Sequence, residues 1–149
     1  MLINLKSLPP GGMTFRGALA PDIIDVDEPG VEFNLPIHYD FKVSLVKHTL
    51  LVRGWLEVEV RFTCSRCLRE FSEKVEIEEF NLRKQIDDPA ATIDLTEDVR
   101  ADIILALPQK PLCRRDCAGL CPICGQDLNM EKCNCSPNRD DSPFRDLKI

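Results

Sequence analysis

The sequence predicts an α+β protein, in which an antiparallel β-sheet is covered by one helix and followed by a cysteine-rich tail. Three observations predict this fold class. Residues 31–64 alternate apolar and polar side chains, residues 95–107 have helical periodicity, and six of the eight cysteines lie between Cys113 and Cys135. With 149 residues, 44% of them hydrophobic, the chain is long enough to bury a core.

Strict alternation marks the expected strands. Apolar residues occupy odd positions between residues 31 and 45, and most even positions between residues 50 and 62. Such alternation is typical of strands that bury one face, and it allows the sheet to curl into a barrel. Gly54, within the second run, indicates a bend or bulge. We therefore expect two neighbouring antiparallel strands in this part of the chain.

The first cysteine motif, CSRC, lies where the second strand ends. Cys64 continues the buried phase of that strand, and alternation resumes at Phe71 and Val75. The motif is thus expected at the tip of an antiparallel hairpin. Residues 85–93 are expected to form a loop. At the N-terminus, Ile3 and Leu5 could add an edge strand, and residues 9–12 read as a turn or linker.

A helix is expected at about residues 95–107, covering one face of the sheet. Asp94 is placed to cap it, Glu97 follows three residues later as in a capping box, and Pro108 ends it. The expected inward stripe comprises Leu95, Val99, Ile103 and Ala106.

The eight cysteines form four closely spaced pairs: Cys64/Cys67, Cys113/Cys117, Cys121/Cys124 and Cys133/Cys135. Zinc prefers four soft ligands in a tetrahedron, and one tight C-x₂-C turn supplies two of them. Disulfides are favoured only in oxidising compartments, and no N-terminal segment indicates export, so we expect a cytoplasmic protein with two zinc ions. The β-rich domain would span residues 1–108, and a zinc-ribbon-like tail over residues 109–149 would pack on the hairpin at 64–67.

The ligand pairing remains open at this stage. The third and fourth pairs can close one site locally, and by exclusion the first and second pairs would form another that clamps the tail to the hairpin tip. Alternatively, the second pair joins the third, and the first joins the fourth. Free thiols are a further interpretation, mainly for Cys113 and Cys117 with their unusual spacing. Redox catalysis by CSRC is not favoured, because the flanking segments are antiparallel strands rather than a βαβ unit.

Five arginines near the cysteine motifs are candidate RNA-binding residues: Arg61, Arg66, Arg69, Arg114 and Arg115. Arginine forms bidentate contacts with phosphate, whereas the net charge of −6 disfavours non-specific attraction to nucleic acid. Alternatively, these charges only offset the thiolates and nearby glutamates. We expect Trp55 to pack beneath the N-terminal segment or the helix rather than to stack on a nucleic-acid base, and His38 and His48 to lie on the surface.

No catalytic constellation is visible, and four thiolates would leave a metal ion no open position for a reactive water. No apolar run approaches the roughly 20 residues that cross a bilayer. We therefore expect neither an enzyme, nor a membrane protein, nor a receptor for a small-molecule substrate.

Five motifs in this order carry a family resemblance: VRG (52–54), CSRCL (64–68), DIILALPQKPLC (102–113), CAGLCPICGQDLN (117–129) and SPFRDL (142–147). From about Val43 onward the chain resembles the YceD family of large ribosomal RNA subunit accumulation proteins. The resemblance implies a non-catalytic role in making or stabilising large-subunit ribosomal RNA, through contact with the precursor, a pre-ribosomal particle or a ribosomal protein. The alternatives are a zinc-ribbon module that contacts a ribosomal or transcription protein and, least favoured, a thiol oxidoreductase.

Overall fold

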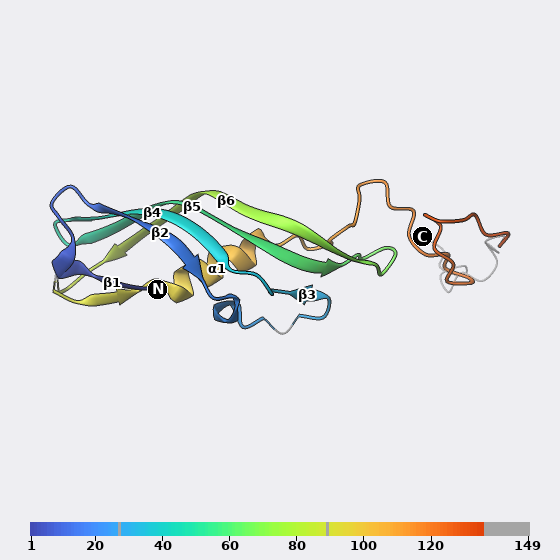
Figure 1. Ribbon diagram of the computed structural model, residues 1–149, viewed down its shortest axis with the longest axis horizontal. Helices are drawn as coiled ribbons and strands as arrows, with labels where there is room; N and C mark the ends of the chain where they lie inside the picture. Colours follow the sequence, from blue (N-terminus) through green and yellow to red (C-terminus); the bar gives the residue numbers. More distant parts are fainter. Residues whose placement is uncertain (27, 89, 136–149) are drawn as a thin grey trace, which may run out of the picture.

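The structure is a computed structural model that describes residues 1–26, 28–88 and 90–135 (Figure 1). Its strands are β1 (Leu2–Asn4), β2 (Met13–Leu19), β3 (Val31–Glu32), β4 (Ile37–Val46), β5 (Thr49–Thr63), β6 (Glu70–Gln85) and β7 (Thr92–Asp94). Its helical segments are the 3₁₀ turns η1 (Leu5–Ser7) and η2 (Pro21–Ile24) and the α-helix α1 (Thr96–Ala106). The predicted combination of an antiparallel sheet and one covering helix is confirmed for this part of the chain.

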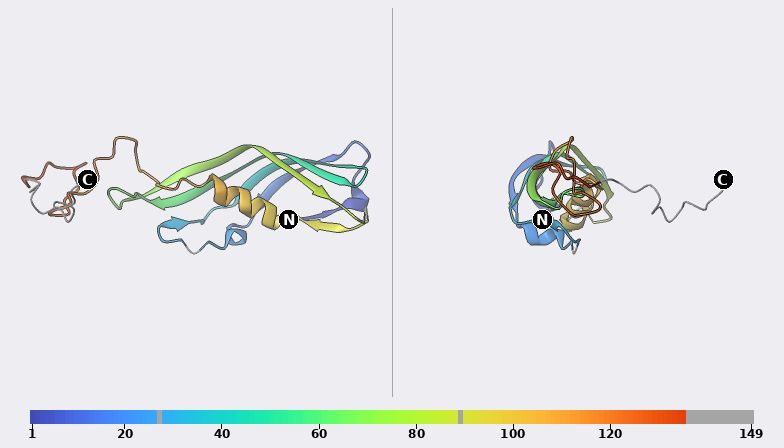
Figure 2. Two further views of the ribbon diagram at one scale, coloured as in Figure 1. Left: turned by 180° about the vertical axis from the view of Figure 1, so that it is seen from behind. Right: turned by 90° about the vertical axis from the view of Figure 1, so that its right-hand side faces the viewer.

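Strand β5 organises the larger sheet. On one edge it pairs with β4 and, near its end, with β3, while β6 follows its other edge along its whole length. Strand β2 then pairs with β4, and every pairing is antiparallel. The sheet curls into a half-barrel around α1, as the end-on view shows (Figure 2). The core lies in this hollow, where Phe41 and Phe80 stack with their ring centroids 4.6 Å apart.

The predicted strand over residues 31–45 is two strands in the structure. Residues 33–36 interrupt it, and Pro36 supplies no N–H group for a sheet ladder. Strand β3 therefore pairs with Arg61 and Phe62 near one end of β5, whereas β4 pairs with its first half.

The predicted irregularity at Gly54 is confirmed. The register between β5 and β6 shifts between Gly54 and Leu56. A Cβ atom at Gly54 would overlap the backbone carbonyl oxygen of Asp40 on β4, so only glycine fits this close approach of two backbones.

The chain's first strand, β1, pairs with β7 in a separate two-stranded sheet. Ile3 lies in this strand and Leu5 in the following 3₁₀ turn, and both are buried. Residues 85–93 are shorter as a loop than predicted, because β6 extends to Gln85 and β7 begins at Thr92 to pair with β1. Strand β2 was not predicted.

Helix α1 begins later than expected. The Asp94 carboxylate accepts hydrogen bonds from the backbone N–H and the hydroxyl of Thr96, at 3.0 and 2.6 Å, but the N-cap position is occupied by Leu95, whose side chain makes no capping hydrogen bond. The predicted capping box is therefore wrong.

The inward stripe of α1 needs one correction. Leu95, Val99 and Ile103 are fully buried as predicted, but Ala106 is exposed. The chain becomes extended at Leu107, and that side chain packs against the core instead.

The outer face of the sheet carries the side chains that point away from α1. His38 and His48 are exposed as predicted, whereas Trp55 is 41% exposed, so its predicted packing role is wrong. The reason is the pleat of β5: Val52 and Leu56 face the core, and Trp55 takes the opposite side. No helix in the described parts of the chain is long and apolar enough to cross a bilayer.

Candidate functional site

The first cysteine motif forms a tight turn at the tip of the β5–β6 hairpin. The Cys64 N–H donates to the carbonyl of Arg69 at 2.9 Å, and the Leu68 N–H donates to the carbonyl of Cys64 at 3.0 Å. The fifth residue of the turn, Leu68, has a left-handed backbone with a φ of 57°. This turn presents the side chains of Cys64 and Cys67 on the same side.

The CPICG motif at residues 121–125, which holds the third cysteine pair, repeats this turn in the tail. The Cys121 N–H donates to the carbonyl of Gln126 at 2.8 Å, and the Gly125 N–H donates to the carbonyl of Cys121 at 2.9 Å. Gly125, equivalent in position to Leu68, has a φ of 74°. In addition, the Ile123 N–H donates to the sulfur of Cys121 at 3.4 Å, as backbone amides do around a metal-bound thiolate. Two segments far apart in sequence thus adopt one local geometry.

The eight sulfurs gather in two groups of four. One group comprises Cys64, Cys67, Cys113 and Cys117, and the other comprises Cys121, Cys124, Cys133 and Cys135. Within each group the sulfur atoms lie within 4.8 Å of one another. In this arrangement Cys121/Cys124 and Cys133/Cys135 close a local site. The alternative, in which Cys113/Cys117 join Cys121/Cys124, differs from the arrangement in the structure.

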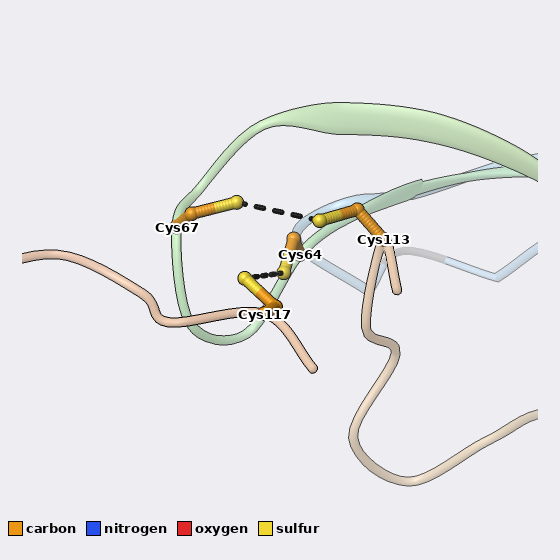
Figure 3. A group of neighbouring side chains, drawn as sticks. All are labelled: Cys64, Cys67, Cys113 and Cys117. Atoms are coloured by element: carbon orange, nitrogen blue, oxygen red, sulfur yellow. Dashed lines mark hydrogen bonds between the residues drawn. The ribbon is translucent and has the colours of Figure 1, made fainter. Parts of the chain in front are cut away.

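The geometry of the first group suits a tetrahedral metal ion. The sulfurs of Cys64 and Cys117 lie 3.8 Å apart, those of Cys67 and Cys113 lie 3.6 Å apart, and all four point toward one another (Figure 3). Four sulfurs placed tetrahedrally around zinc at about 2.3 Å would be about 3.8 Å apart. All eight cysteines are free, and these separations are far longer than a disulfide bond. Both groups could therefore hold a metal ion.

Electrostatics make each group receptive to a cation. Burial acts to raise the pKa of Cys64, but hydrogen bonds from the backbone N–H groups of Cys113, Cys67 and Arg66 outweigh it and lower the pKa to about 6. Burial and the thiols around it raise the pKa of Cys113 to about 12. One sulfur thus ionises readily while a neighbour resists a second negative charge, and a divalent cation would relieve that conflict.

The second group behaves in the same way. Backbone N–H groups of Cys124 and Ile123 lower the pKa of Cys121 to about 6. The thiol of Cys124, together with burial, raises the pKa of Cys135 to about 12. This group is more open to solvent than the first, because Cys124 is exposed whereas Cys64, Cys67 and Cys117 are buried.

Backbone contacts hold the tail against the hairpin tip beside the first group. The Ser65 N–H donates to the carbonyl of Pro111 at 2.9 Å, and the Leu120 N–H donates to the carbonyl of Arg66 at 3.0 Å. Gly119 lies against the same carbonyl with a φ of 78°, where a Cβ atom would come within 3.0 Å of the oxygen. The tail is therefore docked by its backbone as well as by its cysteines.

Asp127 and Asn129 were missed by sequence reasoning, although both lie in the GQDLN segment. The Asn129 amide oxygen accepts from the Ala118 N–H at 2.8 Å, and its amide nitrogen donates to the sulfur of Cys117 at 3.5 Å. Asp127 accepts from Asn129 and from Arg69, which comes from the hairpin. The backbone N–H and side chain of Asn129, with Arg69, lower the pKa of Asp127. An Asp-x-Asn sequence after a cysteine turn is the signal that could have identified this network.

Three of the five candidate arginines lie at the junction between hairpin and tail and have partners within the protein. Arg66 donates to the Cys117 carbonyl at 2.9 Å, Arg69 pairs with Asp127 at 2.9 Å, and Arg114 donates to the Asn129 amide oxygen at 2.7 Å. These contacts give the three a structural part in docking the tail.

The other two candidate arginines are less constrained. Arg61 lies 3.8 Å from Glu32 on the surface. Arg115 is exposed and has no ion pair or side-chain hydrogen bond to the residues that the structure describes. The closing motif at residues 142–147 lies outside the described residues.

The family model described as "Large ribosomal RNA subunit accumulation protein YceD" matches residues 52–149. An uncharacterized protein of Mycobacterium leprae is 30% identical over 118 residues, which cover 68% of this chain and 53% of that protein. Uncharacterized proteins of Mycobacterium bovis and Mycobacterium tuberculosis are each 31% identical over 109 residues, 62% of this chain and 51% of theirs. The chain thus spans about half the length of the curated relatives it matches. No solved structure shows significant similarity to it.

The matched region contains the hairpin tip, α1 and all eight cysteines. The turns and sulfur groups described above are therefore features of the part of the chain that the family model covers. The chain belongs to the YceD family of large ribosomal RNA subunit accumulation proteins.

Proposed function

We propose that this protein is a non-catalytic ribosome-assembly factor that supports the accumulation or processing of large-subunit ribosomal RNA. It acts in the cytoplasm by binding the RNA precursor or an assembly intermediate. Two zinc ions, one in each group of four cysteines, hold its tail in shape. The observation that carries this proposal is the family match, which includes both groups.

The cysteine geometry supports a structural use of metal. Four thiolates complete the tetrahedral shell that zinc prefers, so neither group offers a position for a substrate or a reactive water. Their role is to fix the tail, over residues 109–149, on the hairpin at residues 64–67. The proposed RNA-contacting residues are Arg66, Arg69 and Arg114 at this junction, together with the exposed Arg61 and Arg115.

Ultraviolet crosslinking in cells tests the function. A tagged copy of the chain, purified under denaturing conditions, should enrich large-subunit precursor RNA over small-subunit RNA if contact is direct. Deleting the gene should lower the ratio of large- to small-subunit RNA. Equal recovery of both RNAs, together with an unchanged ratio after deletion, would refute the proposal.

Arg115 provides the cleanest test of the junction surface, because substituting Arg66, Arg69 or Arg114 would also loosen the tail. Arg115→Ala should weaken binding to the crosslinked RNA and lower the slope of log K against log salt by about 0.7, the value for one phosphate contact. Lys6→Ala, an exposed cation at the N-terminus, is the control. If the two variants bind equally well, Arg115 is not an RNA contact.

A zinc-ribbon module that binds a ribosomal or transcription protein is the second candidate function. Large apolar side chains at the cysteine-rich end favour it, because Leu68, Ile123 and Met130 are 64%, 57% and 73% exposed. In that case ribosomal RNA should be recovered only under native conditions and lost when proteins are denatured before purification. A thiol oxidoreductase is the least favoured candidate; turnover of a dithiol substrate that Cys64→Ser abolishes would be its signature.

A further inference from the structure

Three cations lie side by side on the outer face of the sheet. Lys42 on β4 is directly opposite Arg53 on β5. Arg83 on β6 is opposite Leu51, which lies two residues before Arg53 on β5 and points to the same outer face, so Arg83 is diagonal to Arg53. Paired residues in an antiparallel sheet point to the same face, and all three side chains are exposed. We call Lys42, Arg53 and Arg83 the sheet cation cluster.

The fold does not neutralise this cluster. Other cations of the same sheet are paired: Arg16 on β2 with Asp40 at 2.7 Å, and Lys74 on β6 with Glu57 at 2.6 Å. Within the described part of the chain, no member of the cluster has an ion pair or a side-chain hydrogen bond. Like charges directly opposite each other destabilise a sheet, so this arrangement costs the isolated protein stability. An external anion would offset that cost.

Trp55 lies beside the cluster on the same face. It is two residues after Arg53, and an aromatic side chain 41% exposed is a ready stacking surface. It borders a shallow hollow of about 170 Å³ lined by Leu56, Glu57, Glu76, Ile77 and Glu78. Two of these carboxylates, on Glu57 and Glu76, are held by Lys74 at 2.6 and 2.9 Å. The face therefore changes from basic to acidic at Trp55.

This combination fits one class of ligand. A single-stranded nucleic acid places phosphates on cations while its unstacked bases remain free to stack on aromatic side chains. An acidic peptide would use only the cations, and a duplex would offer no free base to Trp55. We propose that the sheet cation cluster and Trp55 form a second contact surface, which binds single-stranded RNA with phosphates on the cations and a base on the tryptophan. This inference deepens the proposed function and rests on it.

The surface is distinct from the cysteine-rich end. It lies on the middle strands of the sheet, toward the β4–β5 hairpin, whereas the tail extends from the opposite end (Figure 1). Neither surface includes a residue of the other, so each can be changed alone.

Intrinsic fluorescence gives a direct test, because Trp55 is the only tryptophan in the sequence. A single-stranded uridine oligonucleotide of about 12 nucleotides, within the usual site size, should quench it on binding. The triple variant Lys42→Gln, Arg53→Gln, Arg83→Gln should lose most of the quenching and lower the slope of log K against log salt by about 2. Its melting temperature should be unchanged or higher, because like-charge repulsion is removed.

The matched control is Lys6→Gln, Lys110→Gln, Lys132→Gln, which removes the same number of charges from exposed lysines outside the sheet. It should bind the oligonucleotide nearly as the wild type does. Equal losses in the two triple variants, an absence of quenching in the wild type, or preference for a polyglutamate peptide over the oligonucleotide would each overturn the inference. If the fluorescence experiment shows no binding at this surface while crosslinking in cells still enriches large-subunit RNA, the inference is wrong but the proposed function stands.

Discussion

Leu68 is a single residue whose backbone conformation is energetically unfavourable but is required by the turn at the hairpin tip. Its φ of 57° is unfavourable for a side chain with a Cβ atom, yet it takes the position that Gly125 fills in the second cysteine turn. Nothing in the periodicity of the sequence indicates this, because only the comparison of two folded turns reveals the equivalence. The side chain is mostly exposed, so the fold gains little from burying it.

Leu68→Gly should therefore stabilise the hairpin tip. Relief of the left-handed backbone is worth about 1 kcal/mol, partly offset by the greater freedom of glycine in the unfolded chain. Thermal unfolding of the zinc-loaded protein should show an equal or higher melting temperature. A clear decrease would mean that the leucine side chain makes a contact that the fold needs.

Asn129 is the second residue whose role the sequence did not reveal. Asn129→Ala removes its contacts with Ala118, Arg114 and the sulfur of Cys117, and we expect zinc affinity to fall about 10- to 100-fold. Competition with a chromogenic chelator measures this. Asn34→Ala is the control, because its side chain donates to Glu32 on the surface, away from both cysteine groups. Equal affinities for the two variants would contradict the assigned role.

At the scale of elements, the alternation of apolar and polar residues predicted the strands that bury one face fully, but it missed a strand that buries one face only in part. Strands β4 and β5 place apolar residues on alternate sides because the core lies on one side. Strand β2 carries only a partial alternation: Phe15 and Leu19 are half-buried against the core, but Gly17 and Ala18 interrupt the pattern, so pairing with β4 defines it. The helix boundary was misjudged because Asp94 also belongs to β7, which places it one residue before the N-cap.

Gly54 is the residue at which a substitution should most disturb the packing of one strand against the next. Gly54→Ala would force a Cβ atom into the Asp40 carbonyl and should lower the free energy of unfolding by about 3 kcal/mol or more. Gly11→Ala is the matched control, since an added Cβ atom there meets nothing within 4 Å. Denaturant unfolding compares the two. Similar midpoints would show that β4 can move away from β5 at little cost.

The whole molecule joins a curled sheet to a tail that has little core of its own. The sequence indicated the two groups of cysteines only as one of two possible pairings, because short spacings bring pairs together in a turn but do not decide which pairs meet. It did not predict the hydrogen bonds that dock the tail, since these join backbone groups of residues 65–66 to Pro111 and Leu120. Nor could it reveal the sheet cation cluster, whose members are adjacent only through strand register.

Metal uptake should be coupled to protons. In the metal-free protein at pH 7, Cys67 and Cys113 hold their protons because their pKa values are raised, so filling this site should release at least two. Affinity should thus fall as pH falls. Below pH 6 the fall should steepen, because Cys64, with its pKa lowered to about 6, also binds a proton. Calorimetry in buffers of different ionisation enthalpy counts these protons; an uptake independent of pH would contradict thiolate ligation.

The central claim is that all eight cysteines hold metal in the two groups that the structure brings together. Elemental analysis of protein purified without added metal tests it most directly. The account predicts two zinc ions per chain, one after Cys64→Ser with Cys67→Ser, and one after Cys133→Ser with Cys135→Ser. Metal-free protein with cooperative unfolding unchanged by a strong chelator, or loss of both ions from either double variant, would contradict it.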